Sequence, residues 1–154
     1  VHKCVLKRRS AKFDCVFKVK SEASTKKNKS EKIVVKNHTF DTVKEALMFC
    51  YDIQNSDSLS AQDAADLMKF ANEYQIMDLK KKMEEFCNEN ISVTNVVCFS
   101  TASIIVDSDE LYQKCFDFLL KCMKDGTAVK DVEELDENMQ KELFLQTFTK
   151  TCKD

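Results

Sequence analysis

Cysteine and histidine are the side chains of this sequence best suited to chemistry, because they act as nucleophiles, bases or metal ligands. The chain has eight cysteines and two histidines, His2 and His38. A cysteine–histidine nucleophile pair is conceivable, but with eight cysteines the sequence gives no reason to choose one. Neither histidine has a metal-ligand spacing to cysteine or aspartate, and there is no CxxC motif. The sequence therefore predicts no metal site and no cofactor.

Two other sequence features of enzymes, glycine-rich phosphate loops and paired catalytic acids, do not support catalysis here. The one glycine, Gly126, excludes the glycine-rich loops that hold phosphate groups, since those loops need at least two glycines. The paired acids Glu84–Glu85 and Glu133–Glu134 fall on polar faces, where they are solvated charge. We therefore predict that the protein is not an enzyme and that it recognises another macromolecule.

The composition indicates a helical protein of one domain with a short appendage. Among 154 residues there is one glycine and no proline, whereas sandwiches and barrels use both in their turns. A net charge of −2 gives no general attraction to nucleic acid or to anionic lipid. No apolar run approaches the roughly 20 residues of a membrane span, and no signal peptide is visible. Scattered cysteines are typical of a reducing compartment, so we expect a cytoplasmic and/or nuclear protein without membrane partners.

The segment 59–90 is the part of the chain around which the other elements must pack. It predicts two amphipathic helices joined by a tight turn, with Ser60 and Asp78 as their caps and Ile76 buried between them. Such a hairpin cannot bury its apolar stripe alone. The stripe recurs at three- and four-residue steps and consists of Ala64, Leu67, Met68, Ala71 and Tyr74, then Leu79, Met83, Phe86 and Cys87.

The flanking segments predict further helices and one strand. Two short helices broken at Ser10 open the chain, the β-branched run 32–35 predicts a strand, and a helix covers 42–51. Ser92 is expected to cap a helix, and residues 104–106 fit either a strand or a helix. A strong helix then runs to Lys124 and ends at Gly126, and a last helix covers 139–148.

Several of these pieces resemble a BTB/POZ domain. The opening is similar to the family pattern His-Lys-x-x-Leu-x-x-x-Ser-x-x-Phe, through His2, Lys3, Leu6, Ser10 and Phe13. The hairpin is similar to the one shared by these domains, with matches at Met68, Ala71, Tyr74, Ile76 and Leu79. The segment from Asn90 to Lys121 resembles the 3-box, the helical pair that follows the domain in MATH-BTB type cullin-3 adaptors.

The resemblance implies a mainly α (α+β) fold. We expect a helical cluster with a small, N-terminally truncated sheet over residues 1–90, because the family's first strand would precede Val1 in a longer chain. A 3-box-like helical pair would occupy 91–125, and an acidic tail with a last helix would occupy 126–154.

The resemblance also implies an adaptor that bridges a cullin-3 ubiquitin ligase scaffold and a substrate bound elsewhere, so that catalysis comes from proximity supplied by partners. The complete protein would be a homodimer with Val5 and Leu6 at its interface. The family's hydrophobic–x–glutamate motif lies in the loop after the second helix and corresponds here to Val19 and Glu22, three residues apart rather than two. The expected contacts with the cullin-3 N-terminal region are Phe17, Val19, Glu22, Tyr51, Tyr74, Val93 and Val97.

Other functions fit the same residues. The chain could be the homo-oligomerisation module of a transcriptional repressor or scaffold protein, without a ligase role. The lysine-rich segment 18–36 predicts a solvated loop, with nucleic-acid binding through Lys26, Lys27 and Lys29 as a more distant alternative. A truncated copy without a partner is a further alternative, and Tyr51 and Tyr74 could be ordinary core side chains.

Overall fold

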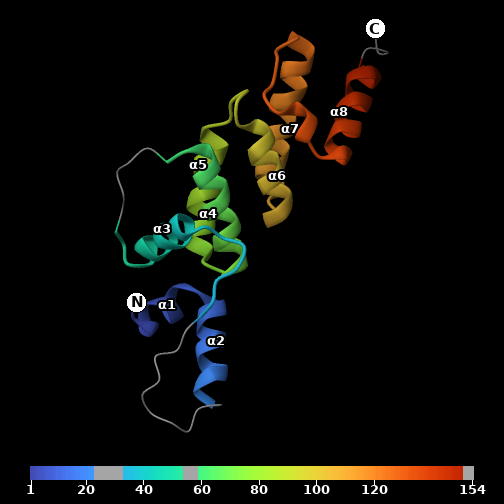
Figure 1. The fold of residues 1–154 in the computed structure, drawn as a ribbon. Coiled ribbons are helices and arrows are strands. Elements are labelled where there is room, and N and C mark those ends of the chain that lie inside the picture. The colour runs from blue at the N-terminus through green and yellow to red at the C-terminus, as the bar shows by residue number, and fades with distance from the viewer. Residues whose placement is uncertain (23–32, 54–58, 151–154) are drawn as a thin grey trace. The chain divides into compact units, whose positions relative to one another are not determined.

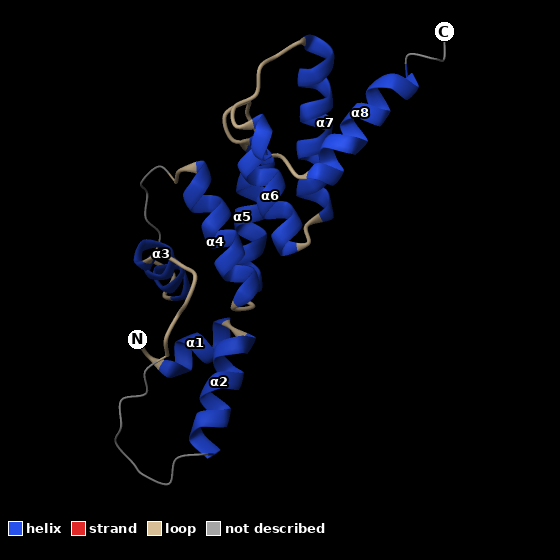
Figure 2. Cartoon of the chain, turned by 45° about the vertical axis from the view of Figure 1, so that its right-hand side comes forward, coloured by secondary structure: helices blue, strands red, loops and turns tan. Residues whose placement is uncertain are grey.

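The computed structural model describes residues 1–22, 33–53 and 59–150, with the side chains of 20–22 and 149–150 excepted. This part of the chain is helical and contains no strand (Figure 2), so the predicted mainly α class is confirmed. The elements (Figure 1) are α1 Lys3–Arg9, α2 Ala11–Glu22, α3 Phe40–Cys50, α4 Ala61–Glu73, α5 Met77–Glu89, α6 Val96–Val106, α7 Asp109–Asp125, the 3-10 turn η1 Val132–Glu134 and α8 Glu137–Lys150.

The strand predicted over 32–35 is wrong for the residues that the structure describes. Ile33, Val34 and Val35 lead into α3 without regular secondary structure, Val34 is 75% exposed, and Lys32 lies outside the described part. A strand is stable only where a neighbour pairs with its N–H and C=O groups. No described residue supplies such a neighbour, so the β-branched composition alone does not produce the small sheet.

The predicted break between the first two helices is confirmed at Ser10. Its backbone is extended, with φ −137°, between the end of α1 and the start of α2. The Ser10 hydroxyl accepts a hydrogen bond from the N–H of Phe13 at 3.1 Å, which is the bond of an N-cap residue. The same hydroxyl donates to the backbone carbonyl of Tyr74, and the Ser10 side chain is buried. A local helix stop therefore also ties α2 to the end of α4.

The predicted hairpin forms, with one of its two caps as expected. The N–H of Asp63 donates to the Ser60 hydroxyl at 3.1 Å, which confirms Ser60 as a cap. Asp78 is not the cap of α5, because that helix begins one residue earlier at Met77. Gln75 makes the turn in the left-handed region, with φ 54°, and Ile76 is buried as predicted. The whole predicted stripe is buried except Phe86, which is half-buried.

The helix after the hairpin begins later than predicted. Ser92 does not cap it, because residues 93–95 form a turn and α6 starts at Val96. The side chain of Asn95 holds this turn: its oxygen accepts from the N–H of Ser92 at 2.8 Å, and its amide donates to the carbonyl of Asn90 at 2.9 Å. Residues 104–106, ambiguous in the sequence, complete α6.

The ends of the last helices follow local signals. Gly126 ends α7 with φ 64°, as predicted, and the next N–H, of Thr127, donates to the carbonyl of Cys122 at 2.8 Å. Asp136 starts α8, because its carboxylate accepts from the N–H groups of Asn138 and Met139 at 3.0 and 3.1 Å.

The chain forms two compact units, and the division between them passes through α4 and α5. The first unit comprises Val1–Ser58 and Asp66–Lys82, and the second comprises Leu59–Ala65 and Met83–Asp154. In the first unit α1 packs on α2 and α3; in the second, α7 packs on both α6 and α8. The predicted boundaries at residues 90 and 125 stay a prediction. None of the described helices has the length and apolar character needed to cross a membrane.

Candidate protein-binding site

An aromatic cluster in the first unit holds two of the predicted contact residues. The rings of Phe70 and Tyr74 stack with their centroids 4.4 Å apart, and Phe13 lies 4.9 Å from Tyr74 and 6.2 Å from Phe17. Phe17 and Tyr74 are both buried. In the isolated chain these two side chains therefore pack α2 against the end of α4, and any contact with a partner would go through their neighbours.

Val19 is the most accessible of the predicted contact residues. It lies near the end of α2 and is 62% exposed. Glu22 is the last residue of the same helix, and its side chain is outside the described part. The resemblance implied a loop after the helix for this motif, whereas the structure continues α2 through it. A helical turn fits the three-residue separation of Val19 and Glu22, because positions three apart are neighbours on a helix.

The other predicted contacts divide between the two units. Tyr51 follows α3 in the first unit, and its hydroxyl oxygen accepts a hydrogen bond from the backbone N–H of His2 at 2.5 Å. Val93 and Val97 belong to the second unit. Val97 is buried, and the carbonyl of half-buried Val93 accepts from the N–H of Lys130 at 2.9 Å.

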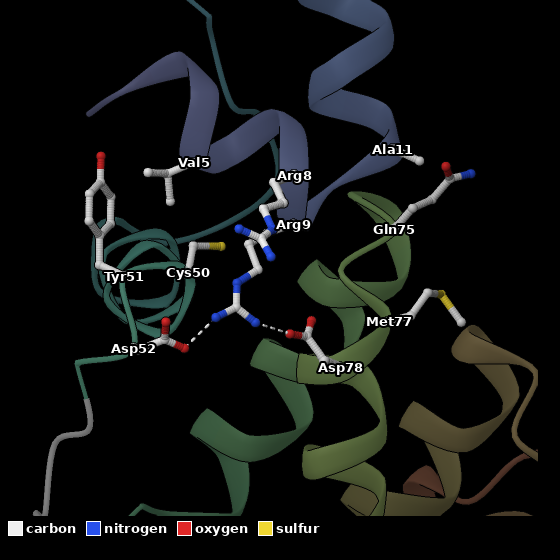
Figure 3. Close-up of a pocket in the computed structure, with 10 residues that line it drawn as sticks. All are labelled: Val5, Arg8, Arg9, Ala11, Cys50, Tyr51, Asp52, Gln75, Met77 and Asp78. Carbon is white, nitrogen blue, oxygen red and sulfur yellow. Dashed lines mark hydrogen bonds and ion pairs between the residues drawn. The ribbon is translucent and has the colours of Figure 1, made fainter.

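A groove that the sequence did not reveal lies beside Tyr51 (Figure 3). Its volume is about 820 Å³, and it is formed by α1, the end of α3 and the turn between α4 and α5. No motif indicates it, because its walls come from three separate parts of the chain. The lining residues are Val5, Arg8, Arg9, Ala11, Cys50, Tyr51, Asp52, Gln75, Met77 and Asp78.

The guanidinium of Arg9 joins the walls of this groove. It donates to Asp78 Oδ2 at 2.6 Å and also to Asp52 Oδ1, as the dashed lines in Figure 3 show. These hydrogen bonds raise the pKa of Arg9, so the side chain stays charged. Because Asp52 is largely exposed, the pairs position α1 and α5 more than they stabilise the fold. Asp78, predicted to cap α5, thus accepts a hydrogen bond from Arg9, which lies 69 residues away in the sequence.

The residues that line this groove suit binding, and none of them is an activated nucleophile. Burial is the main cause that raises the pKa of the Cys50 thiol, to about 11, so the thiol is protonated at neutral pH. Arg8 is exposed and makes no ion pair with any described residue. Val5 and the exposed Met77 add apolar surface, while Leu6, the other predicted dimer residue, is buried. An arginine beside apolar side chains suits recognition of a protein surface.

A charged group, formed by Glu73, Lys12 and His38, lies beside the aromatic cluster of the first unit. Glu73 pairs with Lys12 Nζ at 2.9 Å and with His38 Nε2 at 2.8 Å. The hydrogen bond from Lys12, and then that from His38, lowers the pKa of Glu73 below its ordinary value of 4.5. The ionised carboxylate is thus favoured by the folded state.

We expect Glu73→Gln to lower the free energy of unfolding at neutral pH and to have no effect in strong acid. A carboxyl whose pKa is depressed by folding contributes its stability above its unfolded pKa, and the contribution is lost as the pH falls through the lowered pKa. Urea denaturation of both proteins at neutral pH and well below pH 4.5 measures this. A difference that stays constant over this range would contradict the prediction.

A known domain family matches the whole first part of the chain. The BTB/POZ domain family matches residues 1–91. The BTB and MATH domain-containing protein 40 of Caenorhabditis elegans is 26% identical over 120 residues, which cover 78% of this chain and 29% of the relative. The chain thus spans less than a third of the length of that curated relative. BTB/POZ domains are protein-interaction domains. Because the match covers more than half of its residues, the chain belongs to the BTB/POZ family.

Proposed function

We propose that this protein-interaction domain works as an adaptor that binds the N-terminal region of cullin-3 and brings it to a substrate protein held by another segment. The observation that carries the proposal is the BTB/POZ match over 1–91, followed directly by the paired helices α6 and α7 at the position of a 3-box. The relative named for its BTB and MATH domains supports the same reading. The adaptor would act in the cytoplasm and/or the nucleus.

The end of α2 is the part of the first unit best placed for the cullin contact. An exposed valine on a helix is the kind of anchor that a partner helix buries in a helix–helix interface. Val19 supplies it, and Glu22 would add a charged contact at the end of the same helix. Buried Phe17 and Tyr74 would support α2 from beneath, and half-buried Tyr51 would contribute a contact from the same unit.

The double change Val19→Ala with Glu22→Ala is expected to weaken binding to the cullin-3 N-terminal region about five- to thirtyfold. Loss of one apolar anchor and one charged contact removes roughly 1–2 kcal/mol of binding free energy, and about 1.4 kcal/mol corresponds to tenfold. Isothermal titration of the whole chain with that region of cullin-3 gives the dissociation constants.

Val34→Ala is the matched control, because Val34 is 75% exposed, lies in the same unit and is outside the proposed contact. Its affinity should equal that of the unaltered chain. Unchanged affinity of the double variant would remove Val19 and Glu22 from the site. If the unaltered chain did not bind cullin-3 and light scattering showed dimers, the chain would instead be a self-association module of a repressor or scaffold protein.

A further inference from the structure

A second groove lies wholly within the second unit, between α7, α8 and the connection that joins them. Its volume is about 590 Å³, within the range of roughly 300–1,000 Å³ that is common for binding pockets. Its walls are mostly apolar and include Leu119 and Met123 of α7, Val132 of the connection, and Leu143 and Phe144 of α8. The packing of α7 on α8 (Figure 1) holds the helices that form two walls of the groove, and Met139 of α8 is fully buried.

Several large apolar side chains at the edge of this groove are exposed. Met123 and Val132 are about half exposed, and Phe144 is 57% exposed. One turn beyond, Phe148 packs its ring on Phe144, with centroids 4.6 Å apart, and is itself exposed. Contiguous exposed apolar side chains around a hollow indicate an interaction surface.

On the side of the connection and the start of α8, an acidic segment forms the rim of the groove. Residues 130–142 carry six acids and two lysines. Both lysines already have partners, since Lys130 pairs with Asp131 at 3.6 Å and Lys141 with Glu137 at 3.9 Å. Glu133 lines the groove, and neither it nor the adjacent Glu134 makes an ion pair within the described part of the chain. The uncompensated charge around the apolar surface is therefore negative.

We infer that this groove binds an amphipathic helix of a partner protein, with its apolar face in the groove and lysines or arginines along its edges. A helix in an apolar groove buries side chains at three- and four-residue steps, and the acidic rim attracts its flanking cations. The same rim disfavours a second copy of this face, because a twofold interface would bring acids against acids. It also disfavours an anionic membrane. The inference is independent of the cullin proposal, because none of the residues proposed to contact cullin-3 lines this groove.

A fluorescent leucine–lysine peptide with a continuous apolar helical face is the probe, and the same peptide with glutamate in place of lysine is its charge control. In anisotropy titrations against the whole chain, we expect saturable binding of the lysine peptide and at least tenfold weaker binding of the glutamate peptide. Val132→Asp with Phe144→Asp should weaken binding of the lysine peptide at least tenfold. Glu133→Lys with Glu134→Lys should weaken it and reduce its dependence on salt.

Ile105→Asp is the matched control, because Ile105 is 55% exposed in the same unit and is not part of the groove. It should bind the lysine peptide like the unaltered chain, and thermal unfolding should show that all these surface variants are folded. Equal affinity for the two peptides would overturn the inference, as would an equal loss for Ile105→Asp. Dimers dissociated by Val132→Asp with Phe144→Asp would show instead that a second copy covers the face. Binding to phosphatidylserine vesicles in place of the peptide would likewise overturn it.

Discussion

Phe70→Ala is expected to lower the free energy of unfolding by about 3–5 kcal/mol, the cost of removing a fully buried phenylalanine from a packed core. Phe70 has no exposed surface, stacks on Tyr74 and forms a T-shaped pair with the His38 ring, with centroids 5.0 Å apart. The change would leave a cavity at the centre of the cluster that joins α2 to α4. Urea denaturation followed by circular dichroism measures the loss.

Phe40→Ala is the control for this experiment, since Phe40 is 79% exposed at the start of α3 in the same unit. Its effect should stay within about 0.5 kcal/mol, as for most surface substitutions. Similar losses for the two variants would show that the aromatic cluster is not the core of the first unit.

Ser10→Ala is expected to lower the free energy of unfolding by about 1.5–5 kcal/mol, although it removes a single oxygen atom. Loss of an N-cap hydroxyl costs about 0.5–2 kcal/mol, and a buried carbonyl left without a donor costs roughly 1–3 kcal/mol more. Both losses occur here, because the hydroxyl accepts from Phe13 and donates to the buried backbone of Tyr74. Denaturation in urea again provides the measurement.

Ser60→Ala separates the contribution of the N-cap from that of the hydrogen bond to the Tyr74 carbonyl. Ser60 caps α4 in the same way but is exposed, so its removal should cost only about 1 kcal/mol. The excess loss at Ser10 then measures the bond to Tyr74. If both variants lost the same amount, the hydroxyl of Ser10 would act as a cap alone and would not join α2 to α4.

The two proposed surfaces suit an adaptor, which must hold two partners at once. The end of α2 exposes Val19 in the first unit, and the groove beside α8 exposes Phe144 in the second. Their chemistry differs, because an acidic segment borders the groove beside α8, whereas Lys18 and Lys20 flank Val19 at the end of α2. Variants at one surface should therefore leave binding at the other unchanged, and this separates failure of one proposal from failure of the other.

Much of the secondary structure could be predicted from the sequence, because the signals that set it are local. The three- and four-residue spacing of the hairpin residues defined the buried stripes of α4 and α5, and Ser10 and Gly126 marked helix ends. Ser92 and Asp78 misled the prediction for a physical reason. Each is a competent cap by type, but Asn95 organises the turn before α6, and α5 begins at Met77, one residue before Asp78.

The candidate sites could be predicted only in part. The resemblance to BTB/POZ domains indicated protein binding and pointed to Val19, which is exposed, but also to Phe17 and Tyr74, which are buried. The spacing of apolar residues indicates which face of a helix is buried. It does not indicate whether an aromatic residue on that face also contacts a partner. The grooves beside Tyr51 and Phe144 had no sequence signal at all.

The sequence by itself determined the helices, their main breaks and the family, because periodicity, capping and motif order are properties of neighbouring residues. Tertiary structure alone decided that residues 33–35 stay outside a sheet, that Arg9 holds two carboxylates, and that α8 leaves Phe144 exposed above an acidic rim. Those outcomes depend on groups far apart in the chain. Strand pairing, ion pairing and burial are fixed only when such groups meet in space.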